Sequence, residues 1–195
     1  LVNAHYSVQR IVQPPPVAAP GSPVPSVPRT LPDPRSLFLG YQYNLTKLPD
    51  EPMRPRLADA RVGYFTVSRF DYSDNRSLTP RVSYVRRWRL EKKDPSAELS
   101  EPKQPIVFWI DRNVPLRYRD TIVEGVLEWN KAFERIGFKD AVQARIQPDD
   151  ADFDTLDARH ASIRWMTTAR PVFGGIGPSQ ADPRTGEILD ADIGI

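Results

Sequence analysis

Histidine and cysteine, the side chains that most often hold transition metals or act as nucleophiles, are scarce in this chain. The two histidines, His5 and His160, lie far apart and do not form the H-x-x-x-H spacing of a helical metal-ligand pair. There is no cysteine, so thiol nucleophiles, Cys-ligated zinc and disulfides are excluded within these residues. Because His160 directly precedes a predicted strand, we interpret it as a structural or exposed histidine rather than a metal ligand or general base.

Carboxylates at alternate positions of the loop 149–154 could offer oxygen ligands to a hard cation such as Ca²⁺. When Asp150 is counted as the first position of a calcium loop, Thr155 stands where the turn glycine is needed and Ala161 where the bidentate glutamate is needed. The sequence therefore favours an ordinary acidic loop, and cation binding by residues 149–157 stays open.

A third candidate is the glycine-rich stretch 174–180, whose backbone could bind a ligand. Glycines let another backbone approach closely, and Pro178 restricts the stretch to a sheet edge or a bulge. An edge strand with little side-chain bulk can bind an extended peptide by strand addition, although a glycine-rich surface loop explains the composition equally well. Asp190 and Asp192 share one face of the next predicted strand, where we expect salt-bridge or loop-anchoring roles.

Composition and charge narrow the classes of partner. The chain has 195 residues, of which 39% are hydrophobic, enough for a modest core. Its 27 basic and 25 acidic side chains leave a net charge of +2, so we expect no nucleic acid partner. In the basic stretch 81–93, alternation places Arg81, Arg87 and Arg89 together, which favours a solvated strand face over a phosphate-binding patch. No apolar run reaches membrane-spanning length, and the first residues lack a signal-peptide pattern.

The elements that would position these groups fall into three predicted parts, 1–35, 36–103 and 104–195. The first ends in a proline-rich stretch that predicts an extended linker or a strap lying on a neighbour. The second is a predicted β-rich accessory domain, in which 62–70 and 81–90 alternate as the arms of a hairpin and 37–44 is a candidate third strand. A polar, proline-punctuated stretch predicts the boundary to the third part.

The third part begins with a strand and a long helix. The continuous apolar run 106–110 predicts a strand buried on both faces at the centre of a sheet. Apolar residues spaced by three and four predict a helix over 116–136. Pro115 suits its first turn, and Gly137 followed by Phe138 predicts a left-handed glycine at its C-terminus.

The remaining elements are predicted strands. The runs 141–146 and 161–166 follow the helix, which predicts a right-handed βαβ unit with at least one parallel pair. A hairpin of 173–180 and 187–195 comes last, with a glycine-rich first arm. The fold class is therefore α+β: a mostly-β N-terminal region, then a mixed sheet with one long helix.

From about Pro32 onward, the chain resembles a family of bacterial zinc-dependent metalloproteases of the metzincin type, in which N-terminal domains precede a catalytic domain. The resemblance covers about four fifths of the chain. It is carried by Asp33-Pro-Arg-Ser36, Arg61-Val-Gly-Tyr-Phe65, Arg89-Leu-Glu-Lys-Lys-Asp-Pro95, Pro105-Ile-Val-Phe-Trp-Ile-Asp111, Glu128-Trp-Asn-Lys-Ala-Phe-Glu134, Gly137-Phe-Lys-Asp140 and Asp182-Pro-Arg-Thr-Gly-Glu-Ile188.

The resemblance implies that 104–195 is the upper subdomain of a catalytic domain, with its strands and helix in the family's order. In that family the next helix carries H-E-x-x-H-x-x-G-x-x-H, whose histidines bind zinc and whose glutamate activates water. The motif is absent here, so we expect zinc in a longer parent and none bound to this chain. The resemblance also implies that substrate lies antiparallel to an edge strand on the cleft rim. It places that strand at Phe173, Gly174, Gly175, Ile176, Gly177, Pro178 and Ser179.

We therefore expect a fragment of a secreted or periplasmic zinc endopeptidase that supplies scaffold and substrate-binding edge, carries no catalytic residue and is inactive alone. Its expected partners are a peptide or protein substrate and the missing C-terminal half of the catalytic domain. The alternative is a non-catalytic peptide-binding or protein-interaction module that uses the same open edge. Because the final run reads as an unfinished sheet, we also expect exposed apolar surface and self-association.

Overall fold

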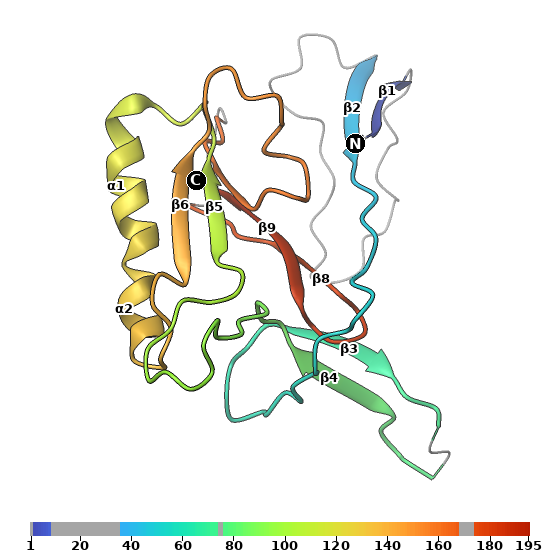
Figure 1. Cartoon of the computed structure of the whole chain (residues 1–195). Helices are drawn as coiled ribbons and strands as arrows, with labels where there is room; N and C mark the ends of the chain where they lie inside the picture. The colour runs from blue at the N-terminus through green and yellow to red at the C-terminus, as the bar shows by residue number, and fades with distance from the viewer. Residues whose placement is uncertain (1, 9–35, 74–75, 168–173) are drawn as a thin grey trace. The chain divides into compact units, whose positions relative to one another are not determined.

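The structure is a computed structural model that describes residues 2–8, 36–73, 76–167 and 174–195. The chain forms two compact units, Leu1–Leu45 with Thr168–Arg170, and Thr46–Thr167 with Pro171–Ile195. Strands predominate, and one long helical segment packs on a mixed sheet within the second unit (Figure 1). The predicted α+β fold class is confirmed.

The described part of the first unit is an antiparallel pair of strands. Strand β1 (Val2–Val8) pairs with β2 (Leu37–Tyr43), with Val2 opposite Tyr43 and Val8 opposite Leu37. The candidate third strand at 37–44 therefore forms, but it pairs with the start of the chain and not with the 62–90 hairpin. The proline-rich stretch 14–34 lies outside the described residues.

A second antiparallel pair forms the predicted hairpin. Strands β3 (Thr66–Phe70) and β4 (Arg81–Val85) pair with Thr66 opposite Val85. Both are shorter than the predicted 62–70 and 81–90. The ladder ends after Arg86, whose N–H donates to Phe65 O, because the N–H of Arg87 donates instead to Gly186 O in the turn between the last two strands.

The largest sheet has five strands in the order β6-β5-β7-β9-β8. The strands are β5 (Ile106–Ile110), β6 (Val142–Ile146), β7 (Ser162–Arg164), β8 (Ser179–Ala181) and β9 (Ile188–Gly194). All neighbours are parallel except β8, which runs antiparallel to β9 at one edge. The predicted βαβ unit and the interior position of the 106–110 strand are confirmed.

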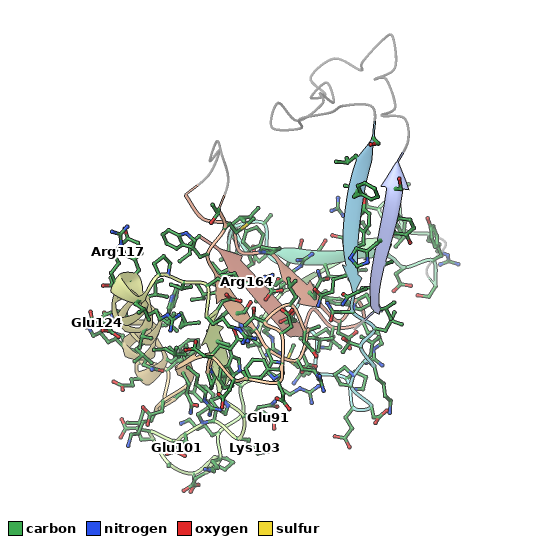
Figure 2. All side chains as sticks on the ribbon, turned by 90° about the horizontal axis from the view of Figure 1, so that it is seen from above. Glu91, Glu101, Lys103, Arg117, Glu124 and Arg164 are labelled. Carbon is green, nitrogen blue, oxygen red and sulfur yellow. The ribbon has the colours of Figure 1, made fainter. Side chains whose placement is uncertain are left out.

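The predicted helix 116–136 forms as α1 (Leu116–Leu127) and α2 (Trp129–Glu134), and Glu128 between them also has helical φ and ψ. Gly137 ends it at φ 88°, with its N–H donating to Glu134 O and the N–H of Phe138 donating to Phe133 O. These two bonds define a Schellman motif, which confirms the predicted glycine stop. The polar side chains Arg117 and Glu124 project from α1 away from the sheet (Figure 2).

The core lies between this helix and the sheet. Ile106, Ala141 and Val142 form one buried cluster, and Ile110, Val114 and Ile163 form another. Partly buried helix residues such as Val126 cover both. Each large apolar side chain that is fully buried contributes about 1.5–3 kcal/mol. These clusters hold β5, β6 and β7 in register and so fix the frame that carries both sheet edges.

The helix covers the sheet incompletely. Both α1 and α2 lie wholly within the described residues, yet none of their side chains is fully buried. An apolar groove of about 510 Å³ remains between helix and sheet. It is lined by Trp88, Ile106, Phe108, Ile122, Gly125, Val126, Trp129, Phe133, Val142, Ile163, Ile193 and Ile195.

Candidate functional site

The predicted binding arm lies at the β8 edge of the sheet. Ile176 forms an antiparallel bridge with Gly194, in which each N–H donates to the other residue's C=O at 2.8 and 2.7 Å. Further along, the N–H of Asp192 donates to Pro178 O at 3.3 Å, and Ser179 then lies opposite Ala191. Residues 176–181 therefore form an irregular edge strand on β9. The prediction of an edge position is correct, although regular pairing is confined to Ser179–Ala181.

The backbone groups of this edge alternate between two directions. Ile176 and Pro178 point their hydrogen-bonding groups toward β9, so the N–H and C=O of Gly175 and Gly177 point away from the sheet. Among the described residues these outward groups have no hydrogen-bond partner. A Cβ at Gly175 or Gly177 would meet neighbours at 3.5–3.7 Å, an ordinary contact, so nothing forces glycine there for packing.

One outward group of the edge is already occupied. Arg86 Nη1, from the segment after β4, donates to Ser179 O at 3.1 Å and lies 3.5 Å from Ser179 Oγ. Its guanidinium therefore takes the place that a partner strand's N–H would need at Ser179. The open part of the edge ends there and consists of Gly175 and Gly177.

Two carboxylates lie behind the edge on β9. Asp192 accepts a hydrogen bond from the Ser162 hydroxyl, and burial raises its pKa. Asp190 lies opposite Gln180, is buried, and its Oδ1 has no hydrogen-bond partner among the described residues. Burial, and then the charge of Asp192, raise the pKa of Asp190 to about 6. Neither carboxylate forms an ion pair in the described part of the chain. Of the predicted salt-bridge or loop-anchoring roles, Asp192 has an anchoring one, because its bond with Ser162 ties β9 to β7.

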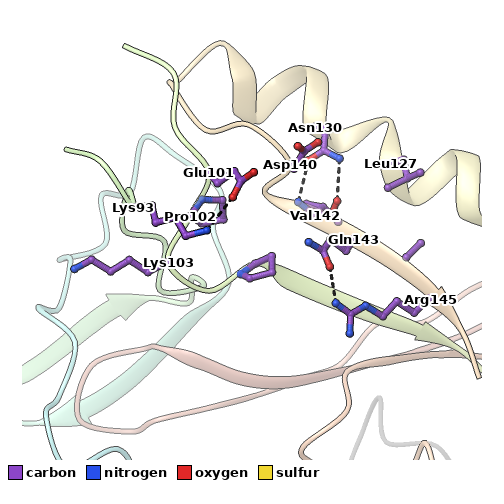
Figure 3. Close-up of a pocket in the computed structure, with 12 residues that line it drawn as sticks. Lys93, Glu101, Pro102, Lys103, Leu127, Asn130, Asp140, Val142, Gln143 and Arg145 are labelled. Carbon is purple, nitrogen blue, oxygen red and sulfur yellow. Dashed lines mark hydrogen bonds and ion pairs between the residues drawn. The ribbon is translucent and has the colours of Figure 1, made fainter. Parts of the chain in front are cut away.

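The opposite edge, β6, is built differently. The Asn130 side chain accepts from Val142 N–H and donates to Val142 O, each at 2.9 Å, as Figure 3 shows. One asparagine therefore imitates a neighbouring strand at the buried start of β6. A cavity of about 530 Å³ beside it is lined mainly by polar groups, including the ion pair of Lys93 with Glu101 at 3.0 Å.

The basic stretch after β4 anchors the last hairpin of the sheet. Arg89 forms a bidentate ion pair with Glu187, at 2.8 and 2.7 Å, and Arg87 Nη2 donates to Arg54 O at 2.7 Å. The prediction of a solvated strand face is wrong for Arg87 and Arg89, because the strand ends at Val85 and their side chains contact the protein. This region therefore fixes the hairpin that carries the β8 edge.

The remaining sequence candidates show no metal-site geometry. His160 stacks on Phe153 with ring centroids 4.2 Å apart, which agrees with a packing role. In the acidic loop, Asp154 Oδ1 accepts from the Leu156 N–H. Across the described ranges, no group of three or more His, Asp or Glu side chains is arranged to hold a metal ion.

Of the seven predicted site residues, Phe173 lies outside the described residues. The other six follow each other along the β8 edge, with Gly175 and Gly177 outward and Ile176 and Pro178 bonded to β9. Sequence reasoning missed Arg86 and Asn130 as edge residues. Arg86 was grouped with its basic neighbours, and the only signal for Asn130 was a polar residue within the apolar stripe of the helix.

Comparison with known proteins gives one partial match. A family model described as a domain of unknown function, DUF5117, matches residues 25–93, about a third of the chain. The match includes β2, β3 and β4, and that description assigns no activity. No curated protein and no solved structure matches the chain. Within the described ranges, no helix has the length and apolar character that crossing a membrane requires.

Proposed function

We propose that the second unit binds an extended peptide by strand addition at the β8 edge, as the substrate-binding part of a secreted or periplasmic zinc-dependent endopeptidase. The bound peptide would lie antiparallel to residues 175–179 and extend the sheet by one strand. This region supplies scaffold and binding groups, and the cleavage chemistry belongs to another part of the full-length protein.

One observation carries the proposal: the outward N–H and C=O groups of Gly175 and Gly177 are unpaired among the described residues, on the glycine-containing antiparallel edge that leads into β8. An unpaired edge is a template for another strand. A peptide residue opposite Gly177 and a second one opposite Gly175 would together form up to about four main-chain hydrogen bonds, following the antiparallel alternation.

The order of elements supports the endopeptidase part of the proposal. The resemblance implies a strand, a long helix, two strands, an edge strand and one further strand. The second unit has β5, the α1 and α2 segment, β6, β7, β8 and β9 in that order, with β8 at the edge. The described residues offer no group suited to zinc, so no step of hydrolysis is assigned to them.

Peptide binding can be tested by removing a single N–H. Gly177→Pro removes the outward donor and places a ring at the edge, and proline is tolerated on edge strands whose N–H faces solvent. Using fluorescence anisotropy with a labelled Thr/Val/Ser peptide of about nine residues, we expect the affinity to fall about tenfold or more, because the peptide loses a hydrogen bond and meets the ring.

Two variants control for unrelated effects of the proline. Gly177→Ala keeps the N–H and adds only an ordinary contact with Ile193, so its affinity should stay within about twofold. Ala144→Pro makes the equivalent change on the β6 edge and should leave binding unchanged. Equal binding by the wild type and Gly177→Pro would show that the peptide does not pair with β8.

The same open edge also suits a non-catalytic peptide-binding or protein-interaction module. The coding sequence beyond Ile195 distinguishes the two functions. An in-frame H-E-x-x-H-x-x-G-x-x-H within about a hundred codons would support the endopeptidase, because its histidines and glutamate supply zinc binding and water activation. A stop codon directly after Ile195 would favour the binding module.

A further inference from the structure

Arg86 stands where the open part of the β8 edge ends. Its side chain is half-buried, Nη1 donates to Ser179 O, and Nε is buried without a hydrogen-bond partner among the described residues. No carboxylate in the described part of the chain lies within ion-pair distance of this guanidinium. Arg86 is therefore a cation that has lost part of its hydration and has only uncharged hydrogen-bond partners among the described residues.

Three other arginines around the sheet have a carboxylate partner, whereas Arg87, like Arg86, has a buried Nε without a hydrogen-bond partner and donates only to a carbonyl among the described residues. Arg89 pairs with Glu187, Arg159 with Asp157 and Arg184 with Asp182, at 2.7, 2.5 and 2.7 Å. A guanidinium that has lost part of its hydration gains most from a carboxylate, because charge-assisted hydrogen bonds are about twice as strong as neutral ones. An anionic group on a ligand would therefore complete the contacts of Arg86.

The direction of the edge says where that group would lie on a peptide. A peptide antiparallel to residues 175–179 has its C-terminal part beside Gly175 and its N-terminal part beside Ser179. Since Arg86 already occupies Ser179 O, the peptide residue there cannot form the usual main-chain bond. A side chain at that peptide position would lie near the guanidinium.

We propose that Arg86 makes the β8 edge selective for peptides with Asp or Glu at the N-terminal end of the paired segment. This inference rests on the proposed peptide-binding function and adds the class of peptide. Arg86 lies within residues 25–93, so the region that matches the DUF5117 model would contribute the specificity-determining side chain.

A glutamate scan tests the proposal on the whole chain. The probes are acetylated, amidated and labelled peptides of about nine residues, each with one Glu at a different position, and matched peptides with Gln there. In the wild type, Glu near the N-terminus should bind about five- to tenfold tighter than Gln, and Glu near the C-terminus should bind no better than Gln. The preference should shrink as NaCl rises from about 50 mM to about 500 mM.

Arg86→Gln is the informative variant, because it removes the charge and keeps a polar hydrogen-bonding side chain at this position. It should bind the Gln peptides like the wild type and lose the preference for Glu, and Arg86→Lys should keep part of that preference. Equal binding of Glu and Gln peptides by the wild type would overturn this inference and leave peptide binding intact. A preference at the C-terminal end, or one that survives in Arg86→Gln, would also overturn it. If no peptide binds, the proposed function itself fails.

Discussion

The two edges of the five-stranded sheet differ in which of their outward backbone groups have hydrogen-bond partners. At β6, Asn130 satisfies both backbone groups of Val142, and longer side chains such as Arg145 follow along the strand. At β8, glycines leave two residues' backbone groups unpaired among the described residues, and only Ser179 O is occupied, by Arg86. An edge strand normally carries features that prevent unwanted pairing with another chain.

The contrast is one of degree. At β6 the Asn130 side chain covers Val142 only, and the outward groups of Ala144 also have no hydrogen-bond partner among the described residues, so the two edges differ at the buried start of β6 and in the glycines that precede β8. Antiparallel direction, small side chains and a cation at the end of the open stretch occur together only at β8 in the described part of this sheet. That combination suits an extended peptide better than a globular surface.

The largest effect should come from opening the protected edge. Asn130→Ala leaves the N–H and C=O of Val142, a residue only 4% exposed, without partners. We expect the free energy of unfolding to fall by about 3 kcal/mol, since each unsatisfied buried group costs about 1–3 kcal/mol. Urea unfolding followed by circular dichroism measures the loss.

Asn113→Ala is the matched control, because Asn113 is exposed and only its backbone N–H is bonded in the described structure. It should change stability by less than about 0.5 kcal/mol. A loss of similar size in both variants would mean that Asn130 does not protect β6.

Asp190 behind the open edge should make stability depend on pH. Its pKa is raised to about 6 in the folded protein, so between about pH 4 and pH 6 the folded state keeps a proton that the unfolded state has lost. The free energy of unfolding should therefore fall as pH rises through this window, by about 2 kcal/mol. Asp190→Asn should remove its share of that fall, leave the part due to Asp192, whose pKa burial also raises, and be more stable than the wild type near pH 7.

Asp157 gives an independent reference for the pH dependence of stability, at lower pH. The Arg159 guanidinium lowers its pKa to about 2, so its contribution is complete above about pH 4 and is lost as pH falls toward 2. Asp190→Asn should leave this loss of stability at low pH unchanged. Parallel pH curves for the two proteins between pH 4 and pH 6 would contradict the assignment to Asp190.

A smaller effect separates self-association from peptide binding. Trp129 is 65% exposed and lines the apolar groove, so it should contribute to association between copies of the chain. Trp129→Gln should raise the dissociation constant of any self-association about fivefold, about 1 kcal/mol, in sedimentation velocity, and leave peptide affinity unchanged. Leu116→Gln, which is 77% exposed at the start of α1 but does not line the groove, should have less effect. A wild type that stays monomeric and binds no hydrophobic dye would remove this role of the groove.

Hydrophobic periodicity and the positions of proline and glycine predicted most of the strands and the helix of the second unit. The strand at 106–110, the helix with its Gly137 stop and the parallel βαβ unit depend on local patterns and formed as expected. These elements are determined by which residues must be buried and by one backbone position that favours glycine.

The contacts between distant segments could not be predicted in the same way. Alternation suggested that the strand 81–90 continues past Val85, but the bonds of Arg87 to Gly186 and of Arg89 to Glu187 involve residues about a hundred positions away. A single sequence holds no signal for such pairings. For the same reason the sequence did not predict that Arg86 bonds Ser179 O at the end of the open β8 edge, or that Asn130 bonds the backbone of Val142 in β6.

Amide hydrogen exchange measured by NMR tests the central claim most directly. On addition of a saturating peptide, the N–H groups of Gly175 and Gly177 should exchange at least about tenfold more slowly, because they become hydrogen-bonded in an added strand. The outward N–H of Ala144 on β6 should not change. Unchanged exchange at both glycines, or protection that appears at Ala144 instead, would contradict the assignment of the binding edge to β8.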